Sequence, residues 1–278
     1  MIEFKNLSFS YSKGKPIFED VNLEWKSGHL YGLLGRNGAG KTTLLKIMTG
    51  LLFPSEGQVT LNGQPSQKRD DDQLKNLYYL QEEIYVPHLK IDQFEKAFAP
   101  FYPNFRHEDF ENYLNEMDLM GEFNYIDKMS HGQKKKVMIA FALATNVPLL
   151  IMDEPTNGLD IPAKSIFRKL MASYAADDRT VIISTHQVRD LHSLIDAVTI
   201  LDKGNIIMNA STDVICDKLY FGTEDQPKED GSVFYTEDTP RGIYVVKENS
   251  EHQDSHLDLE LLFNAAVSNS DKFKSMFQ

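Results

Sequence analysis

The chain has 278 residues and a formal net charge of -12, and its length suffices for one large domain with a small appendage. Hydrophobic residues make up 41% and charged residues 25% of the chain, a globular composition that excludes a fibrous repeat. The negative charge repels polyanions, so no nucleic-acid partner is expected.

The chain lacks the sequence signals of secretion and membrane insertion. The N-terminal residues, MIEFKNLSFSY, contain no basic lead followed by an apolar run, so no secretory signal is expected. No stretch reaches about 18 apolar residues, so no membrane-spanning segment is predicted. The single cysteine excludes an intrachain disulfide. These features together predict a cytosolic protein.

The N-terminal segment predicts strands and then a helix. Residues 2–11 and 21–25 alternate apolar and polar side chains, which is the period of half-buried antiparallel strands. Residues 30–35, LYGLLG, form a short apolar run that ends in glycine and predicts a buried strand. Residues 41–52 place apolar side chains at helical spacing. We therefore expect a strand, a glycine loop and a helix over residues 30–52.

The middle of the chain predicts further strands and helices. PLLIMDEP (148–155) and TVIISTH (180–186) indicate buried strands, and residues 161–175 between them indicate a helix. Strands and helices that alternate in this way predict an α/β fold with a mainly parallel sheet. Residues 91–126 carry aromatic and aliphatic side chains at helical intervals. They predict a helical insert, which we place at about residues 85–140.

The C-terminal part of the chain differs in charge from the rest. Residues 215–262 contain twelve acidic and four basic residues. Two short strand candidates, SVFYT and GIYVVK, precede a final amphipathic run, LDLELLFNAAV. The sequence therefore predicts a main domain at residues 1–210 and a small acidic α+β appendage at residues 211–278.

A phosphate-binding loop is predicted at GRNGAGKT, residues 35–42, which has the spacing of glycine, four residues, glycine, lysine and threonine. Glycines let backbone N–H groups converge on phosphates, and the following helix adds the positive end of its dipole. Lys41 is expected to reach the β- and γ-phosphates, and the Thr42 hydroxyl to bind Mg²⁺. The alternative, a structural glycine turn, is disfavoured by the flanking strand and helix. The predicted nucleotide-binding residues are Gly35, Asn37, Gly38, Gly40, Lys41, Thr42 and Thr43.

A pair of carboxylates follows the buried strand in LLIMDEP. Asp153 is expected at the polar end of the strand, where its carboxylate can hold hydrated Mg²⁺. Glu154 comes next and is a candidate base for activating water. The alternative is that the pair only caps a helix, but the phosphate loop favours a metal ligand and a base.

In order and spacing, residues 1–210 resemble the ATP-binding subunit of an ABC (ATP-binding cassette) transporter. A Ser-x-Gly-Gln box, within MSHGQ at residues 129–133, is part of this pattern. Its serine lies 23 residues before Asp153. The resemblance implies the P-loop NTPase ABC-ATPase fold, with an N-terminal antiparallel β subdomain, an inserted α-helical subdomain and a small C-terminal appendage. It also implies ATP and Mg²⁺ as cofactors.

The resemblance assigns roles to three residues that spacing alone leaves open. Tyr11 matches an aromatic residue that stacks on adenine; the alternative is a strand aromatic in the core. Gln81, in YYLQEE, matches the Q-loop glutamine, which touches Mg²⁺ and the attacking water. His186 lies 32 residues after Glu154 and matches the H-loop histidine, which contacts the γ-phosphate; the alternative is an ordinary polar residue at a strand end.

The remaining matched residues face a second subunit in this family. Ser130, Gly132 and Gln133 belong to the signature box, and Asp160, in NGLD, matches the D-loop aspartate across the dimer interface. His131 stands where the family usually has glycine, and its side chain could contact a triphosphate or point to solvent. The three lysines at residues 134–136 are interpreted as the solvated face of a helix.

The resemblance implies a mechanism with two ATP molecules between two subunits. The signature box of one subunit closes over the γ-phosphate bound by the other, in a head-to-tail dimer that we expect to be a homodimer. Glu154 polarises water for in-line attack, and Lys41, His186 and Mg²⁺ stabilise the developing charge, with Gln81 as the fourth expected catalytic residue.

The resemblance also implies a separate transmembrane permease subunit, because the chain has no membrane segment of its own. The ATPase is then expected in the cytoplasm, peripheral on the inner face of the cell membrane. The acidic C-terminal tail resembles that of drug- or antibiotic-type exporters, which favours export.

Two other functions are considered. One is a soluble ABC ATPase that acts in translation or assembly, but those on the ribosome typically carry two cassettes and a long charged linker, and this chain has one phosphate loop. The other is an ATP sensor without turnover, which the presence of Glu154 and His186 disfavours. The transported substrate is not specified by the sequence.

Overall fold

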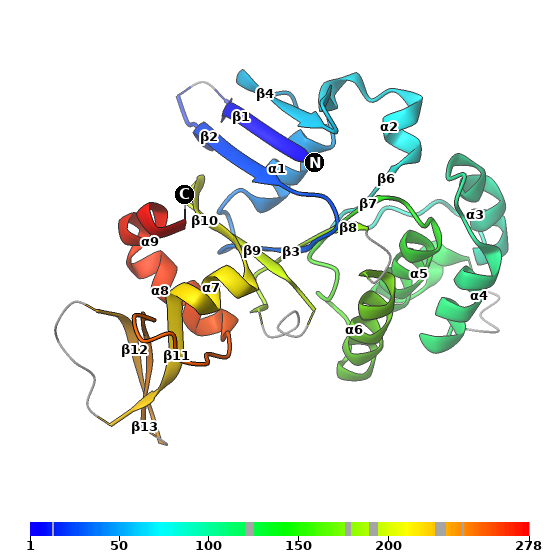
Figure 1. Cartoon of the computed structure of the whole chain (residues 1–278). Coiled ribbons are helices and arrows are strands. Elements are labelled where there is room, and N and C mark those ends of the chain that lie inside the picture. Colours follow the sequence, from blue (N-terminus) through cyan, green and yellow to red (C-terminus); the bar gives the residue numbers. More distant parts are fainter. Residues whose placement is uncertain are drawn as a thin grey trace.

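Three β-sheets organise the part of the chain that the computed structural model describes (Figure 1). The described residues are 1–12, 14–119, 125–175, 179–188, 194–225, 232–240 and 242–277. The largest sheet has six strands in the order β10-β9-β3-β8-β7-β6. Its strands are β3 (Leu30–Leu34), β6 (Leu77–Leu80), β7 (Leu149–Asp153), β8 (Thr180–Thr185), β9 (Ala197–Asp202) and β10 (Asn205–Ser211).

The centre of this sheet is parallel and buried. Strand β3 pairs in parallel with β8 and β9, β7 with β8, and β6 with β7, whereas β9 and β10 are antiparallel. Every residue of β3 and β8 is buried, as expected for strands covered on both faces. The predicted buried strands are therefore confirmed. Because parallel strands share a direction, the loops that follow β3, β8, β7 and β6 lie at one edge of the sheet.

An antiparallel sheet is built from the N-terminal segment, as the fold class predicts. It has the order β2-β1-β4-β5. Its strands are β1 (Ile2–Phe9), β2 (Phe18–Trp25), β4 (Glu56–Leu61) and β5 (Gln64–Pro65). The fully buried Trp25 joins this sheet to the central one, because its Nε1 donates a hydrogen bond to the Thr199 hydroxyl in β9 at 2.8 Å. Helix α1 (Lys41–Met48) follows β3 directly in the chain, after the glycine loop.

The helices that come between β5 and β8 in the chain lie on the side of the molecule that holds β6, β7 and β8 (Figure 1). They are α2 (Asp71–Lys75), α3 (Ile91–Phe98), α4 (His107–Glu116), α5 (His131–Ala144) and α6 (Ile161–Ala175), with 3₁₀ turns at Ser66–Lys68, Ala99–Phe101 and Ile126–Lys128. The ring of Phe141 in α5 lies within 5.0 to 6.1 Å, between centroids, of five other aromatic rings, including Phe94 of α3 and Phe110 of α4. This aromatic cluster gives the predicted helical insert its core; residues 120–124 of the insert lie outside the described residues.

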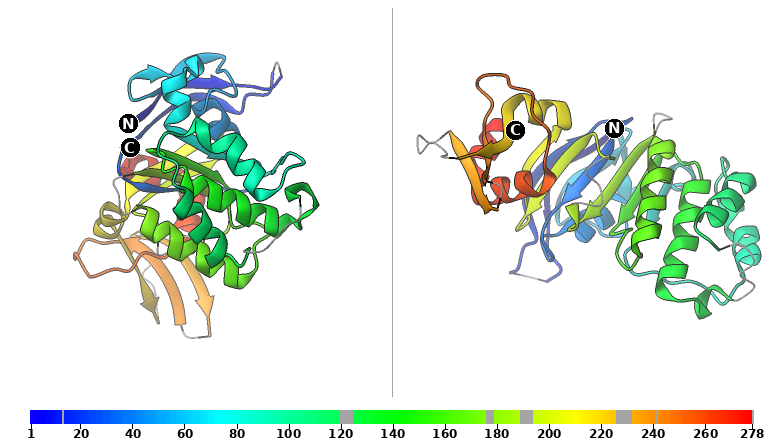
Figure 2. Two further views of the ribbon diagram at one scale, coloured as in Figure 1. Left: turned by 90° about the vertical axis from the view of Figure 1, so that its right-hand side faces the viewer. Right: turned by 90° about the horizontal axis from the view of Figure 1, so that it is seen from below.

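The C-terminal segment forms a separate small sheet flanked by helices. Its elements are α7 (Thr212–Lys218), β11 (Leu219–Glu224), β12 (Val233–Thr239), β13 (Gly242–Glu248), α8 (Leu259–Ser268) and α9 (Ser270–Phe277), and the sheet order is β11-β13-β12. Figure 2 shows that this segment and the helical insert lie at opposite ends of the molecule. Buried residues of α8, such as Leu262, share a hydrophobic cluster with Ile207 and Met208 of β10. The expected α+β appendage therefore packs directly on the central sheet.

In the described part of the chain, no helix is both long enough and apolar enough to cross a bilayer.

Candidate functional site

The loops at the carboxyl edge of the parallel strands enclose a pocket of about 540 Å³. It is lined by Ile17, Arg36, Asn37, Gly38, Gly40, Lys41, Thr42, Thr43, Glu82, Glu154, Asn157 and His186. The glycine loop after β3, the turn after β7 and the residue after β8 all contribute to this lining. The structure therefore brings together the predicted phosphate loop, Glu154 and His186.

The glycine loop requires a backbone that most residues avoid. Gly40 has φ 111°, and a Cβ built on it would lie 2.9 Å from the ring of Phe18. Helix α1 starts at the next residue, Lys41, so its first N–H groups are available to an anion. The buried Lys41 ammonium donates a hydrogen bond to the carbonyl oxygen of Gly35 at 2.8 Å. The loop thus has the backbone and the cation that phosphate binding requires.

Glu154 lies at the centre of the pocket and is only 4% exposed. Its φ of 48° is uncommon for a residue with a side chain, and its N–H donates to the carbonyl oxygen of Ser184 at 3.1 Å. Nδ1 of His186 lies 2.8 Å from Glu154 Oε1, and the Thr185 hydroxyl donates to Oε2 at 3.2 Å. Lys41 Nζ is 3.4 Å from Oε1. A carboxylate held from three sides can accept a proton from a water molecule in a fixed position.

Asp153 lies behind this pocket and is fully buried. It accepts hydrogen bonds from the Ser184 hydroxyl and from the Tyr79 hydroxyl, the latter at 3.3 Å. Burial and the nearby Asp153 carboxylate raise the pKa of Tyr79 well above its ordinary value, so the phenol stays protonated and donates. The Asp153 carboxylate is thereby fixed in orientation, which suits a group expected to act on a hydrated ion.

The segment after β6 reaches the pocket through Glu82, the neighbour of Gln81. Gln81 directly follows β6 and is exposed, and among the described residues the pocket lining includes Glu82 and not Gln81. Glu82 Oε1 accepts a hydrogen bond from Asn157 Nδ2 at 3.2 Å. Glu82 is exposed as well, and the role expected of Gln81 towards Mg²⁺ and the attacking water stays a prediction. The pocket residues that sequence reasoning did not select are Ile17, Arg36, Glu82 and Asn157.

The predicted signature residues and Asp160 lie at the starts of helices and are not among the described residues that line this pocket, although Asn157, the first residue of NGLD, does line it. The Ser130 hydroxyl accepts a hydrogen bond from the N–H of Gln133 at 3.2 Å, and Gln133 Oε1 accepts one from the N–H of Ser130 at 2.9 Å, a capping box for α5. Asp160 likewise accepts from the N–H of Ala163 at the start of α6, at 2.8 Å. Both Ser130 and Asp160 are exposed, which leaves them accessible to another molecule.

His131 is exposed, in line with the alternative that its side chain faces solvent. Its ring lies against the D-loop of its own chain, because a Cβ built on Gly158 would come within 2.8 Å of His131 Cδ2. Gly158 has φ 82°, so this position also favours glycine by its backbone. The histidine in the signature box therefore packs against a D-loop that has room for it.

Two other predictions concern exposed or buried side chains. Tyr11 is 60% exposed, and its hydroxyl lies 3.2 Å from the Thr43 hydroxyl. The interpretation of Tyr11 as a core aromatic is therefore wrong, and stacking on adenine stays a prediction.

Lys135 has no exposed surface, so the interpretation of all three lysines as a solvated helix face is also wrong.

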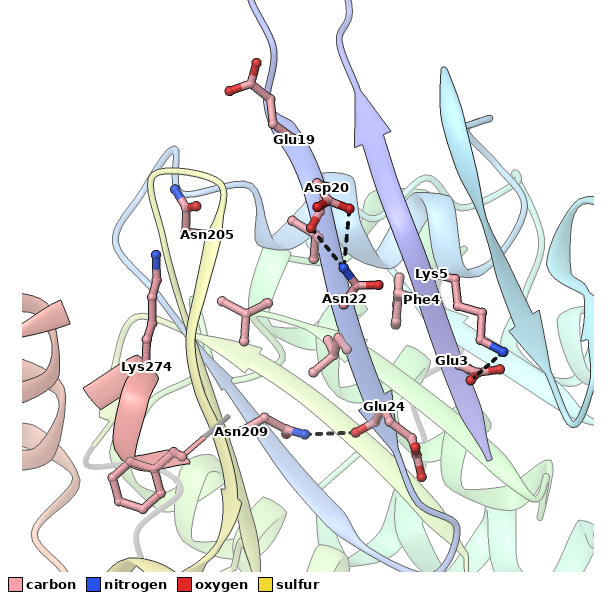
Figure 3. A pocket seen from close by; sticks show the side chains of 14 residues that line it. Glu3, Phe4, Lys5, Glu19, Asp20, Asn22, Glu24, Asn205, Asn209 and Lys274 are labelled. Atoms are coloured by element: carbon pink, nitrogen blue, oxygen red, sulfur yellow. Dashed lines mark hydrogen bonds and ion pairs between the residues drawn. The ribbon is translucent and has the colours of Figure 1, made fainter. Parts of the chain in front are cut away.

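A second pocket, of about 590 Å³, lies between β2, β10 and α9 (Figure 3). Its lining includes the side chains of Glu3, Glu19, Asp20 and Glu24, with Lys5 and Lys274. This lining contains no glycine loop, and acidic side chains predominate in it, which disfavours a triphosphate. We therefore assign the nucleotide to the pocket at the carboxyl edge of the parallel sheet.

The fold and the site define a class of protein. A glycine loop between β3 and α1, together with an oriented buried glutamate and a histidine at the ends of neighbouring parallel strands, defines a P-loop nucleotide hydrolase.

Comparison with known proteins identifies the family within this class. The family model described as "ABC transporter" matches residues 18–157. The chain is 32% identical to the energy-coupling factor transporter ATP-binding protein EcfA of Methanocaldococcus jannaschii, over 74% of this chain and 77% of that protein. It is 30% identical to the lantibiotic transport ATP-binding protein SrtF of Streptococcus pyogenes, over 77% of this chain and 92% of that protein.

A solved structure gives the same result. The structure titled "Structure of ATP binding subunit of ABC transporter" has a TM-score of 0.69 and 27% identity, over 77% of this chain and 92% of that one. The chain belongs to the family of ATP-binding subunits of ABC transporters and is an ATPase. The predicted family, fold class and ATPase function are confirmed.

Proposed function

We propose that the chain hydrolyses ATP with Mg²⁺ at a site completed by a second copy of itself, and that this hydrolysis powers export through a separate membrane subunit. The observation that carries the proposal is the convergence of Lys41, Glu154 and His186 in one pocket beside the glycine loop. A cation, a base and a histidine at that point are the groups that attack on a terminal phosphate requires.

The oxygen groups around the glycine loop fit a magnesium ion. The Thr42 hydroxyl and the Glu82 carboxylate line the pocket, and such oxygens are the ligands that Mg²⁺ prefers, together with waters and substrate phosphates. No group of three or more His, Cys, Asp or Glu side chains in the described part of the chain could hold a metal by itself. We infer that Mg²⁺ would enter with ATP and would be held by Thr42, Gln81 and Asp153, with the Glu82 carboxylate as a further oxygen group in the same pocket. When bound, it would neutralise charge on the phosphates.

Glu154 is the proposed general base. Its carboxylate is oriented by the Thr185 hydroxyl and by His186, so it can take a proton from the attacking water without first reorganising. Lys41 lies between Gly35 and Glu154, and we infer that its ammonium turns to the β- and γ-phosphates when they are bound. His186 is proposed to contact the γ-phosphate with the ring nitrogen that does not face Glu154.

The site is proposed to be shared between two copies in a head-to-tail dimer. Ser130, Gly132, Gln133 and Asp160 lie outside the pocket of their own chain, which supports a role in the site of the partner. The exposed start of α5 at Ser130 offers backbone N–H groups and a helix dipole to the γ-phosphate. The Tyr11 ring, at the edge of the glycine loop, is proposed to stack on adenine.

A negative charge at the signature box tests this arrangement. In a Glu154→Gln background, we expect Ser130→Asp to abolish the dimer that forms with ATP, because its carboxylate would face the triphosphate bound by the partner. Aspartate is a good N-cap, so α5 should remain intact. The ATP affinity of the monomer should change by about 0.5 kcal/mol or less, as for a remote surface substitution. Sedimentation velocity with ATP and a fluorescent-nucleotide titration measure the two properties.

The matched control is Ser211→Asp, because Ser211 also caps a helix through its hydroxyl, which accepts from the N–H of Val214 at 3.4 Å. In the same Glu154→Gln background, the Ser211→Asp variant should still form the dimer with ATP. An ATP-dependent dimer that persists in the Ser130→Asp chain would rule out the proposed role of the signature box.

The proposed domains and the membrane partner are those expected from the sequence. Residues 1–210 are proposed to form the ATP-binding domain, with the helical subdomain at about 85–140 facing a separate transmembrane permease subunit. Residues 211–278 are proposed to be an accessory domain. The chain is then expected in the cytoplasm, held on the inner face of the cell membrane by the permease. Export is proposed as the direction from the acidic C-terminal tail, and one relative is named for lantibiotic transport.

Inverted membrane vesicles that carry this chain and its membrane subunit test the direction. Export predicts that a labelled lantibiotic peptide accumulates inside such vesicles when ATP is supplied outside, because the face that hydrolyses ATP then points outward. Vesicles with the Glu154→Gln chain should accumulate no peptide above the level without ATP. ATP-dependent release of peptide from preloaded inverted vesicles would contradict export.

A further inference from the structure

Lys135 is a buried cation with no role in the mechanism derived above. It lies in α5, five residues after Ser130, and none of its surface is exposed. Its ammonium donates a hydrogen bond to the backbone carbonyl oxygen of Glu82 at 3.3 Å. Burial lowers the pKa of Lys135, and the carboxylates of Glu82, Asp153 and Glu154 act against this shift. The ammonium therefore lies within the electrostatic field of the nucleotide site.

A lysine at this position is costly for packing alone. Removing an ammonium from water costs several kcal/mol, and hydrophobic side chains of similar volume often replace buried ion pairs without loss of stability. The neighbouring buried positions of α5, Val137 and Ile139, are apolar. A charge at Lys135 is thus better explained by what it contacts than by the core it occupies.

What Lys135 contacts connects two parts of the site. Glu82 lines the nucleotide pocket, and its carboxylate accepts a hydrogen bond from Asn157, in the turn that follows Glu154. Lys135 belongs to the helix whose first turn carries the signature box. One ammonium therefore joins the helix that serves the partner's ATP to the loop that serves the chain's own ATP.

We propose that Lys135 is a positioning residue of the ATPase site: its ammonium holds the backbone of the Glu82 loop against the signature helix and balances the charge of Glu82 beside Asp153 and Glu154. A glutamate at the edge of a triphosphate site adds to an already negative group of carboxylates. The buried cation behind it offsets that charge, so Glu82 can face the nucleotide. This inference rests on the proposed ATPase site.

A double-mutant cycle in the full-length chain tests the proposal, with Lys135→Met, Glu82→Gln and the double variant. Lys135→Met should lower kcat for ATP by about ten- to hundredfold, the size of effect that a misplaced catalytic group produces. KM for ATP should stay nearly unchanged. The midpoint of urea unfolding should also fall little or not at all, because methionine packs without a desolvation cost. In the double variant the loss should be smaller than the product of the two single losses, since Glu82→Gln removes the charge that Lys135 balances.

Lys136→Met is the matched control. Lys136 is the next residue of the same helix, and its ammonium also donates to a backbone carbonyl oxygen, that of Met117 at 3.3 Å, but Met117 does not line the nucleotide pocket. This variant loses the same kind of bond and the same charge. Its kcat should stay within about twofold of the unmodified chain.

Each contrary result has a separate meaning. Wild-type kcat in Lys135→Met, or a loss of kcat matched by an equal loss of stability, would overturn the positioning role. Single losses that simply multiply in the double variant would overturn the link to Glu82. Absence of ATP hydrolysis by the unmodified chain, measured in the same assay, would instead overturn the proposed function.

Discussion

Glu154→Gln will lower the rate of ATP hydrolysis by about 10²- to 10⁴-fold, the contribution expected of a general base. Glutamine has nearly the same shape, and it can still accept from Thr185 and pair with His186, which hold the carboxylate at 3.2 Å and 2.8 Å. It cannot take a proton from water. ATP binding should persist, because the glycine loop and Lys41 are unchanged. Phosphate release measured at saturating ATP reports the rate.

The same substitution should stabilise the ATP-bound dimer. A chain that binds ATP and does not hydrolyse it stays in the closed state, so sedimentation should show a dimer with ATP and a monomer without it. Glu56→Gln is the matched control, because Glu56 is an exposed carboxylate in β4 and lies outside the pocket. If Glu154→Gln hydrolysed ATP at the rate of this control, Glu154 would not be the base.

Much of the site could be predicted because its chemistry is local in the sequence. The glycine loop from Gly35 to Thr42 is one continuous segment. It contains the turn, the start of helix α1 and the Lys41 cation. Asp153 and Glu154 end a strand that is apolar throughout, and the carboxyl edge of a parallel sheet then brings them to the phosphate loop. Both predictions needed only chain order and strand direction.

Other features of the site depend on contacts between distant segments. Gln81 and Glu82 are neighbours, and only the course of the chain after β6 decides which one faces the pocket. Lys135 looks like part of a solvated lysine run, but α4 and α5 pack together and the Glu82 loop covers it. His131 stands where the family usually has glycine, and its ring lies against Gly158 in the D-loop, which has no side chain. None of these contacts leaves a pattern within its own segment.

The contacts that the sequence hid differ in what they connect. Glu82 and Asn157 both line the chain's own pocket, and His131 and Gly158 both belong to segments proposed to serve the partner. Lys135 joins the two sets, because it lies in the signature helix and contacts the Glu82 loop. Movement of the signature helix on dimer closure would therefore act on the Glu82 loop and on the D-loop.

Lys41→Met will weaken ATP binding by about ten- to hundredfold, because one charge-assisted hydrogen bond to phosphate contributes about 1.5–3 kcal/mol. Methionine keeps most of the volume in the buried site beside Gly35 and Glu154. The rate of hydrolysis at saturating ATP should also fall, since Lys41 is expected to stabilise charge that develops on the phosphates. A fluorescent-nucleotide titration gives the affinity, and phosphate release gives the rate.

Lys46→Met is the matched control for Lys41→Met. Lys46 lies in the last turn of the same helix, α1, and outside the pocket lining, so its loss changes the net charge equally without removing a phosphate contact. Binding by this variant should stay within about twofold of the unmodified chain. The two variants separate a direct contact with phosphate from the general electrostatic effect of one positive charge. A general effect would weaken ATP binding equally in both variants. Equal affinities in the two variants would therefore show that Lys41 does not touch the nucleotide, and would remove the phosphate loop from the site.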